Sequence, residues 1–444
     1  MKKIVLIVFA CAFVLTGHCE VLTLDSCLSY ARQRNCTIQS ALLDVQISQQ
    51  VKKQVFTKYF PQVNITAFGF YAIDPLVKIY IPGLMQTELG RTAVEGLFDL
   101  LQEDNPSVSR DITMLQWGVT AGASVVQPIF MGGRIINGNK LAKVGVEASE
   151  KQVEVSERDI LQEVEDTYWM VAGLYEKRET IKQVRELLDT IQGVADLAFN
   201  NGLVTGNDVL KVQLKKNEIE TKATQLEDGI VLASKLLCQL TGLDYTGELE
   251  LEPFPKEEAV EAMVLVDTFM VAGRPEAELL ELNIKAEQLR KKMTIGEALP
   301  QVGIGLQGGY SNFFDRDRWN GLAFAFVRIP ITQWWETGHK IKEHNLRIEK
   351  AQMMQQDLMG KMALQNEQVY NQLNEAIRLV IQHESGLKMA EDNYRISLMN
   401  YEAGMTTMSE LLESQALLLQ AQNAYTDARI SMRAAQRKFN ELNK

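Results

Sequence analysis

The chain contains Phe199-Asn200-Asn201-Gly202-Leu203-Val204-Thr205-Gly206-Asn207-Asp208-Val209-Leu210 and, 202 positions later, Tyr401-Glu402-Ala403-Gly404-Met405-Thr406-Thr407-Met408-Ser409-Glu410-Leu411-Leu412. The two stretches match aromatic to aromatic, glycine to glycine, carboxylate to carboxylate and leucine to leucine. Tyr168 and Tyr370 keep the same offset, as do Pro128 and Pro330. Two copies are fewer than the roughly three that a stacked repeat protein needs. The sequence therefore predicts a single protomer that is internally duplicated.

Both copies also open alike, with Phe60-Pro61-Gln62-Val63 in the first and Leu299-Pro300-Gln301-Val302 in the second. We expect each copy to hold a helix, two strands and a long helical hairpin. The predicted division is a signal peptide over residues 1–19, a first repeat over 20–240, a connector over 241–274 and a second repeat over 275–444. The connector is rich in glycine and proline, which predicts little regular structure.

The N-terminus has the layout of a bacterial secretory signal. Lys2-Lys3 is followed by an apolar run from Ile4 to Leu15 and by small residues near the expected cut after Cys19. A lipid anchor on Cys19 is the alternative, but His18 is large and polar where a lipoprotein signal needs a small residue. No later apolar run approaches the roughly 18 residues of a membrane-spanning helix.

Composition narrows the function further. The net charge of −11 argues against a nucleic-acid partner, because phosphate binding needs clustered Lys and Arg. Cys27, Cys36 and Cys238 would remain after cleavage. Their odd number and their spacing fit neither a disulfide framework nor a zinc site, so we expect small buried residues without chemistry.

Period-two alternation predicts four β-strands. Leu115 to Val125 sets apolar odd positions against small or polar even positions, and Val63 to Ile73 alternates less cleanly. In the second copy, Val302 to Tyr310 alternates with glycine and glutamine, and Leu322, Phe324 and Phe326 alternate with glycine and alanine. We expect Asp74–Thr113 to join the first pair and Asn312–Arg318 the second. Interfacial aromatic residues, as in membrane strands, are expected near the strand ends: Tyr71, Trp117, Tyr310 and Trp319.

Helical periodicity fills most of the remaining chain. Leu24 to Lys58 is predicted as one helix, capped by Asp25 or Ser26. Long coiled-coil-like helices follow each strand pair, with a second helix after each turn. They are expected over Arg134–Phe199, Asn207–Leu240, Glu336–Tyr401 and Met408–Leu442. At 1.5 Å per residue, each first helix would be roughly 100 Å long.

Four membrane strands cannot stand alone, because an open sheet leaves unpaired backbone groups that each cost several kcal/mol in hydrocarbon. Two chains would close an eight-stranded barrel whose interior is filled by side chains, whereas three would close twelve strands around a channel. A small, polar set suits a wet lumen: Gly118, Thr120, Gly122, Ser124, Gly303, Gly305, Gln307 and Gly309. A soluble coiled-coil rod with incidental strands is the alternative.

The whole mature chain resembles the outer membrane efflux proteins, the TolC-like outer membrane factors. The resemblance is carried by the two turn stretches, the Phe60-Pro61 and Leu299-Pro300 pairs, the opening Leu22-Thr23-Leu24-Asp25-Ser26-Cys27-Leu28, and Gln127-Pro128-Ile129-Phe130-Met131-Gly132-Gly133. It implies a mainly α fold with a membrane β-barrel part. In that fold a trimer shares a 12-stranded barrel, and coiled-coil helices form a periplasmic α-barrel. It also implies a periplasmic adaptor and an inner-membrane pump as partners.

The turns hold the candidate site residues. The resemblance implies that the tips dock the adaptor, at Gly202, Leu203, Val204, Gly404, Met405 and Thr406. Glu410 and Glu413 share a helix face, and the resemblance places them at the closed tunnel mouth. Threefold symmetry would gather six such carboxylates into a ring that favours cations. Asp208 and Tyr401 are candidates for hydrogen bonds that hold this periplasmic gate shut.

No catalytic residue, cofactor or metal is predicted. Gly303-x-Gly305-x-x-Gly308 matches a dinucleotide fingerprint as text, but it lies within an alternating strand and no helix follows at once. The prediction is a passive exit duct of a tripartite efflux pump or type I secretion system in the outer membrane of a Gram-negative bacterium. An outer-membrane coiled-coil adhesin or scaffold without transport is the alternative.

Overall fold

The computed structural model describes residues 21–74, 76–80, 88, 92, 111–114, 116–253, 273–313 and 316–442. The expected signal peptide, with Cys19, lies outside these residues, as does much of the Asp74–Thr113 connection and of the connector. The chain divides into two compact units. We call them the hairpin unit, within 1–47, 147–283 and 351–444, and the sheet unit, within 48–146 and 284–350.

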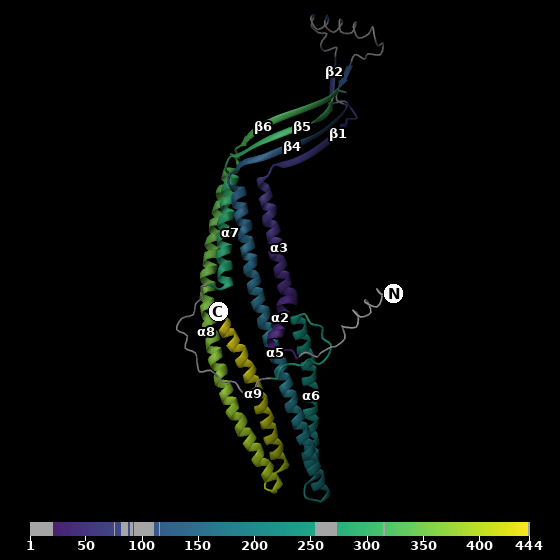
Figure 1. Cartoon of the computed structure of the whole chain (residues 1–444), viewed down its shortest axis with the longest axis vertical. Helices are drawn as coiled ribbons and strands as arrows, with labels where there is room; N and C mark the ends of the chain where they lie inside the picture. Colours follow the sequence, from purple (N-terminus) through teal and green to yellow (C-terminus); the bar gives the residue numbers. More distant parts are fainter. Residues whose placement is uncertain are drawn as a thin grey trace, which may run out of the picture. The chain divides into compact units, whose positions relative to one another are not determined.

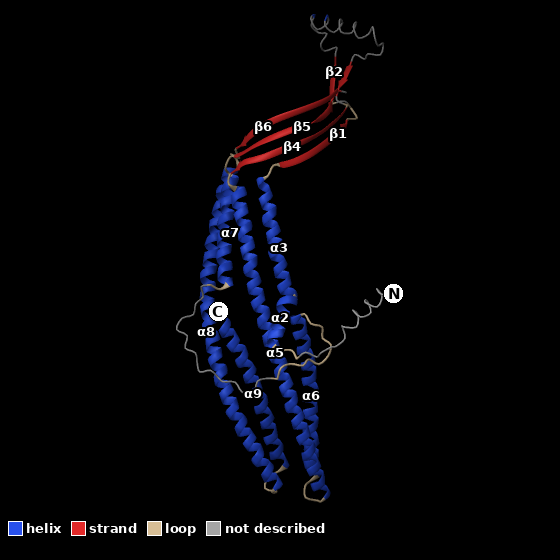
Figure 2. Ribbon diagram, viewed as in Figure 1, coloured by secondary structure: helices blue, strands red, loops and turns tan. Residues whose placement is uncertain are grey.

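Long helices dominate the described chain, together with a four-stranded and a two-stranded antiparallel sheet (Figures 1 and 2). In chain order the elements are α2 (Leu24–Arg34), α3 (Cys36–Phe56), a 3-10 turn η1 (Thr57–Tyr59), β1 (Gln62–Tyr71), β2 (Val77–Tyr80), β3 (Asp111–Met114), β4 (Trp117–Met131), α5 (Arg134–Asn200), α6 (Gly206–Thr241), α7 (Pro275–Glu297), β5 (Gln301–Phe313), β6 (Arg316–Arg328), α8 (Gln333–Glu402) and α9 (Met408–Leu442). The four long helices expected after the strand pairs are confirmed as α5, α6, α8 and α9.

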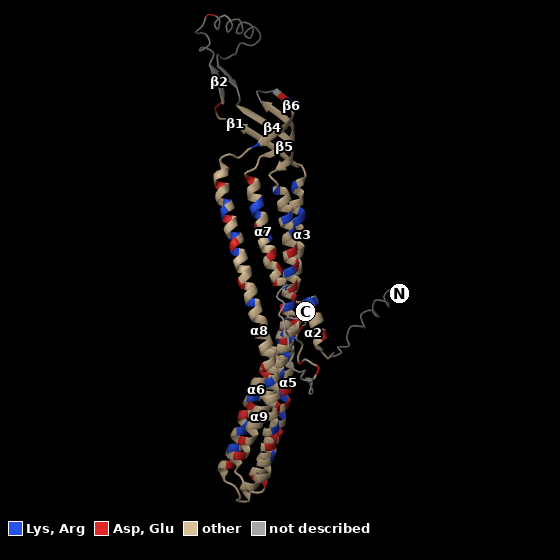
Figure 3. Cartoon of the chain, turned by 90° about the vertical axis from the view of Figure 1, so that its left-hand side faces the viewer, with Lys and Arg blue, Asp and Glu red and all other residues tan. Residues whose placement is uncertain are grey.

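Charged side chains are spread along the helices, whereas the strands carry very few (Figure 3). None of the helices in the described part of the chain combines the length and the apolar character that crossing a membrane requires.

The single helix expected over Leu24–Lys58 is wrong, because the chain breaks at Asn35. Asn35 leaves the helical region with ψ 128°, and its Oδ1 accepts hydrogen bonds from the amides of Thr37 (2.9 Å) and Ile38 (3.4 Å). Its Nδ2 donates to the carbonyl of Leu240 at 2.9 Å. A contact 205 residues away therefore fixes the break. The expected cap is also corrected, since Thr23 caps α2 in a capping box with Ser26.

Asn35 is 5% exposed, so its loss should be costly. We expect Asn35→Ala to remove the side-chain hydrogen bonds at the start of α3 and to leave the Leu240 carbonyl without this donor. The free energy of unfolding should fall by about 2–3 kcal/mol. Thr37→Ala, at an exposed neighbour, should change it by less than about 0.5 kcal/mol. Circular dichroism of denaturant unfolding in detergent measures both. Equal effects of the two changes would contradict this account of the break.

The cysteines of the described chain are free thiols. Cys27 and Cys238 are buried as expected, and burial raises the pKa of the Cys27 thiol to about 11. Cys36 is exposed, which corrects the expectation that all three are buried.

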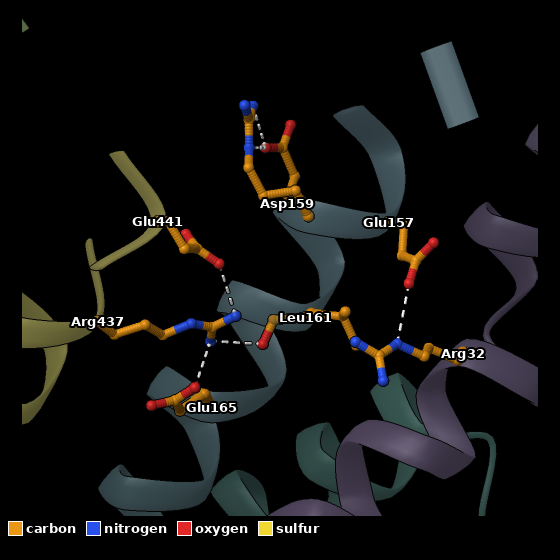
Figure 4. Close-up of polar contacts among 8 residues, drawn as sticks. Arg32, Glu157, Asp159, Leu161, Glu165, Arg437 and Glu441 are labelled. Carbon is orange, nitrogen blue, oxygen red and sulfur yellow. Dashed lines mark hydrogen bonds and ion pairs between the residues drawn. The ribbon is translucent and has the colours of Figure 1, made fainter. Parts of the chain in front are cut away.

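A buried arginine ties α9 to α5 in the hairpin unit. Arg437 donates to the carbonyl of Leu161 at 2.6 Å and forms ion pairs with Glu165 (3.0 Å) and Glu441 (3.1 Å; Figure 4). Because its side chain is only 11% exposed, this arginine needs all three partners. Arg32 on α2, whose side chain is 57% exposed, forms a surface ion pair with Glu157 of α5 at 2.9 Å (Figure 4).

The main sheet has the strand order β1-β4-β5-β6, all antiparallel, so β1 and β6 are its edges. The four strands expected from alternation are confirmed in this sheet. A short ladder of β2 with β3 was missed, because four residues are too few to reveal a period. The ladder lies in the expected Asp74–Thr113 connection, and β3 continues one residue beyond it to Met114.

The register sorts the side chains of the sheet onto two faces. Gly122 pairs with Gly309, and Ser124 pairs with Gln307, so the expected small, polar set shares one face, here called the glycine-lined face. The opposite, apolar face carries a set of exposed hydrophobic side chains: Val63, Ile65, Tyr71, Trp117, Val119, Ile304, Leu306, Trp319 and Val327. Tyr310 pairs with Trp319 on this face, so the four expected aromatic residues lie together on it.

Strand β6 places two phenylalanines on the glycine-lined face. Phe324 pairs with Gly305, and Phe326 pairs with Gly303. A Cβ atom built on Gly305 would lie 2.4 Å from the Phe324 ring, so the ring covers bare glycine backbone. The sequence of β6 does not reveal which face its phenylalanines take. They alternate only with alanine and glycine, which fit either face.

Candidate functional site

The turn between α5 and α6 is a Schellman motif centred on Gly202. Gly202 has φ +71°, a left-handed conformation that glycine adopts at little cost. Its amide donates to the carbonyl of Phe199 at 2.9 Å, and the amide of Leu203 donates to Ala198 at 2.8 Å. These bonds satisfy the last carbonyls of α5 and end the helix.

The turn between α8 and α9 repeats this geometry, bond for bond. Gly404 has φ +72°, its amide donates to Tyr401 at 3.0 Å, and Met405 donates to Asn400 at 2.8 Å. Every donor and acceptor lies 202 positions after its counterpart in the first turn. The matched sequence stretches therefore build matched backbone turns.

Both following helices begin with a capping box. The amide and hydroxyl of Thr205 donate to Asp208 Oδ2 at 3.2 and 2.8 Å. The amide of Thr407 donates to Glu410 Oε2 and the amide of Glu410 donates to Thr407 Oγ1, both at 3.3 Å, while the Thr406 hydroxyl also donates to Glu410. Hydrogen bonds from these threonines lower the pKa of Asp208 and of Glu410. Both carboxyl groups are therefore held in the charged form.

The turns present large apolar side chains to the outside. Leu203 is 79% exposed and Met405 is 74% exposed. Val204 and Thr406 beside them are half-buried. A Cβ atom built on either Gly202 or Gly404 meets no heavy atom within 4 Å, so both glycines border open space. We call Gly202–Val204 and Gly404–Thr406 the two tips.

Glu410 and Glu413 are both exposed in the first turns of α9. Glu410 is engaged in its cap, whereas Glu413 has no hydrogen bond or ion pair within the described part of the chain. Tyr401 is half-buried, and burial together with the nearby charge of Asp208 raises the pKa of its hydroxyl. The hydrogen bonds that Asp208 makes go to Thr205 and Lys211.

Lys211 is a residue of this region that the sequence reasoning missed. Its Nζ lies 3.4 Å from Asp208 Oδ1 and donates to Ser409 Oγ at 2.8 Å, so it bridges α6 and α9. Lys211 and Glu413 occupy matched positions of the two repeats and carry opposite charges. That contrast was the one signal in the sequence that could have drawn attention to this position.

The helices that carry the two tips share one hydrophobic core. Val212 on α6 is fully buried, as is Leu411 on α9, and Met408 is 2% exposed. They belong to one hydrophobic cluster with Leu188 on α5. The caps and the lysine bridge therefore stand on rigid helices rather than on a loose loop. Among the described residues, no three His, Cys, Asp or Glu side chains lie close enough to hold a metal ion.

Comparison with known proteins agrees with this architecture. Residues 27–243 match the profile of the outer membrane efflux protein family. The solved structure of VceC from Vibrio cholerae is similar with a TM-score of 0.73 at 14% identity, over 94% of this chain and 95% of that one. The CmeC outer membrane channel of Campylobacter jejuni gives 0.73 at 15% identity, over 94% and 85%. The MtrE outer membrane channel of Neisseria gonorrhoeae gives 0.69 at 13% identity, over 94% and 88%. No curated protein matches the chain by sequence. Identities this low show a shared fold.

Proposed function

Through residues 27–243 this chain belongs to the outer membrane efflux protein family, and we propose that it is the exit duct of an efflux pump in the outer membrane. The family and the fold are those of channels. The observation that carries the proposal is the apolar face of the sheet. Type I secretion would use the same duct for polypeptides.

The apolar face is unsuited to water. Ile65 is 83% exposed, Trp319 is 82% exposed and Leu306 is 60% exposed, and large apolar side chains cover this face on all four strands. Contiguous exposed apolar surface of this kind marks an interaction site for a membrane or a partner. Tyr71, Trp117, Tyr310 and Trp319 on the same face fit the aromatic girdle of a membrane barrel.

The edges of the sheet support closure by further copies of the chain. Within the described sheet, β1 and β6 each pair on one side only, and unpaired backbone groups are costly in lipid. Pairing β6 with β1 of a sister copy satisfies both edges at once. Three copies close twelve strands around a lumen, and the glycine-lined face then points inward. The homotrimer supplies the membrane barrel, and the long helices supply the periplasmic tunnel.

The two tips are the docking surface for a periplasmic adaptor, which links the duct to an inner-membrane pump. The exposed Leu203 and Met405 support this role, because burying apolar side chains of this size beneath a partner is favourable. Glu410 and Glu413 line the periplasmic gate, with Asp208 and Tyr401 beside them. The Lys211–Ser409 bond, which joins the two hairpins of one chain, stabilises the closed arrangement.

The duct is tested with adjacent substitutions on opposite faces of β1. Ile65→Arg puts a charge on the lipid side and should cost about 2–4 kcal/mol near the bilayer midplane, removing the trimer from outer-membrane fractions. Thr66→Arg, one residue on, faces the lumen and should leave assembly intact. Planar bilayers should then show discrete single-channel currents from the native chain and from Thr66→Arg.

Two results would overturn the proposal. Assembly without any conductance would identify a scaffold or adhesin rather than a duct. If arginine is tolerated equally at positions 65 and 66, the sheet does not form a membrane barrel.

A further inference from the structure

The glycine-lined face of the sheet carries positive charge. Arg318 and Arg328 lie ten positions apart on β6, so their side chains leave the same face. The register pairs Arg318 with Ser311 and Arg328 with Gln301, both of which are neutral. Both arginines are exposed, and within the described residues neither has a hydrogen bond or an ion pair.

No carboxylate of the sheet balances these two arginines. Strands β1, β4 and β5 contain neither Asp nor Glu, and β6 contains only Asp317. Asp317 pairs with Asn312 on the apolar face, where it accepts hydrogen bonds from Tyr310 (2.5 Å) and Asn312 (2.6 Å). The one acidic side chain of the sheet is therefore on the other face and already occupied.

Sister copies do not supply the missing charge from their strands. In the proposed trimer, β6 meets β1 of the next copy, whose glycine-lined face carries polar neutral residues at Gln62, Asn64 and Thr66. Since the copies are identical, every strand around the ring follows the same rule. On the glycine-lined face, the strands of each chain then bring arginines to the lumen, including Arg318 and Arg328, and no carboxylate.

We infer that the barrel lumen is a passage selective for anions, with Arg318 and Arg328 as its specificity-determining residues. This inference rests on the proposed function, since it needs the sheet to be closed into a barrel. The arginines form two rings separated by about 33 Å along the strands. Guanidinium groups stay charged and bind carboxylates and phosphates in a bidentate manner. Low-dielectric walls focus their field, which raises the local concentration of anions by about tenfold or more. The favoured solutes carry carboxylate, phosphate or sulfonate groups.

The test is the chloride-to-potassium permeability ratio, from reversal potentials across a KCl gradient. Arg318→Gln with Arg328→Gln should lower this ratio by at least about threefold, because the focused charge is gone. The effect should shrink in 1 M salt, where the Debye length is only about 3 Å. Asp317→Asn is the matched control, since it removes a charge from the same strand on the opposite face and should leave the ratio unchanged.

Each variant is measured both in the native chain and with Glu410→Gln and Glu413→Gln present, so that a closed gate does not mask the lumen. An unchanged ratio in conducting channels would overturn the inference and leave the duct standing. An equal shift from Asp317→Asn would also overturn it, since position on the face would then not matter. If no variant conducts, with or without the gate substitutions, the proposed duct function is wrong, and the inference fails with it.

Discussion

Replacing Gly202 and Gly404 together by valine is expected to abolish export while the trimer still reaches the outer membrane. Both glycines hold a left-handed backbone, at φ +71° and +72°, and a side chain there costs about 1–2 kcal/mol at each turn. The Cβ atom of the new side chain meets no neighbour within 4 Å, so we attribute the effect to backbone strain. We expect the Schellman bonds to be lost and the tips to unravel locally. Substrate resistance in cells should fall by at least about tenfold if docking is lost.

The matched control for these glycines is Gly206→Ala. Gly206 belongs to the same turn but does not have a left-handed φ, and a Cβ there makes ordinary contact with the Phe199 ring at 3.5 Å. This change should leave resistance intact. Full resistance in the double valine variant would show that the tip backbone has no part in docking.

A second pair of changes separates the surface of the tips from their backbone. Leu203→Glu with Met405→Glu keeps both turns, because neither side chain supports the fold. Burying a side chain of this size contributes about 1.5–3 kcal/mol, which corresponds to roughly tenfold or more in affinity for each anchor. Adaptor recovered by pulldown from membranes should fall accordingly. Undiminished recovery would place the docking surface elsewhere.

The second large effect is expected at the gate, where Glu410→Gln with Glu413→Gln should raise single-channel conductance several-fold. In the proposed trimer, Glu410 and Glu413 of three copies gather six carboxylates at the mouth, and the change removes their charge. Glutamine is chosen instead of alanine because it completes a capping box as glutamate does. The start of α9 is thus preserved, and only the electrostatics differ. The chloride-to-potassium ratio should rise, opposite to the effect of removing the arginines.

Glu367→Gln provides the control for this charge change, since Glu367 is exposed on α8, 37 positions before Gly404. It should alter neither conductance nor selectivity. If the double glutamine variant conducts like the native chain, the gate assignment of Glu410 and Glu413 is lost, whereas the duct itself remains.

Much of this molecule was predictable because its decisive interactions are local. The long helices follow from heptad-like spacing, and the two tips follow from a glycine placed after an aromatic residue and before a capping box. The hydrogen bonds of the two Schellman motifs join residues no more than five positions apart. Neighbours in the chain determine such structures, so a one-dimensional pattern is sufficient to find them.

The features that the sequence did not predict depend on residues that lie far apart along the chain or on strand pairing. Asn35 looked like an ordinary helical residue, and only the carbonyl of Leu240, 205 residues away, makes it a break between α2 and α3. Lys211 donates a hydrogen bond to Ser409, which lies 198 residues away, and no residue spacing within α6 or α9 predicts that bond. The β2–β3 ladder is too short to show its period before its strands are paired.

By itself the sequence determined the helical hairpins, the strand segments and the two turns, since each depends on residues that are close along the chain. Tertiary structure decided which face each strand residue takes. Only the register puts Phe324 over Gly305 and collects Tyr71, Trp117, Tyr310 and Trp319 on the apolar face. It also places Arg318 and Arg328 on the face opposite to that of Asp317. The physical reason is that a strand alternates its two faces strictly, so the identity of each face is fixed by pairing with neighbouring strands and not by the strand itself.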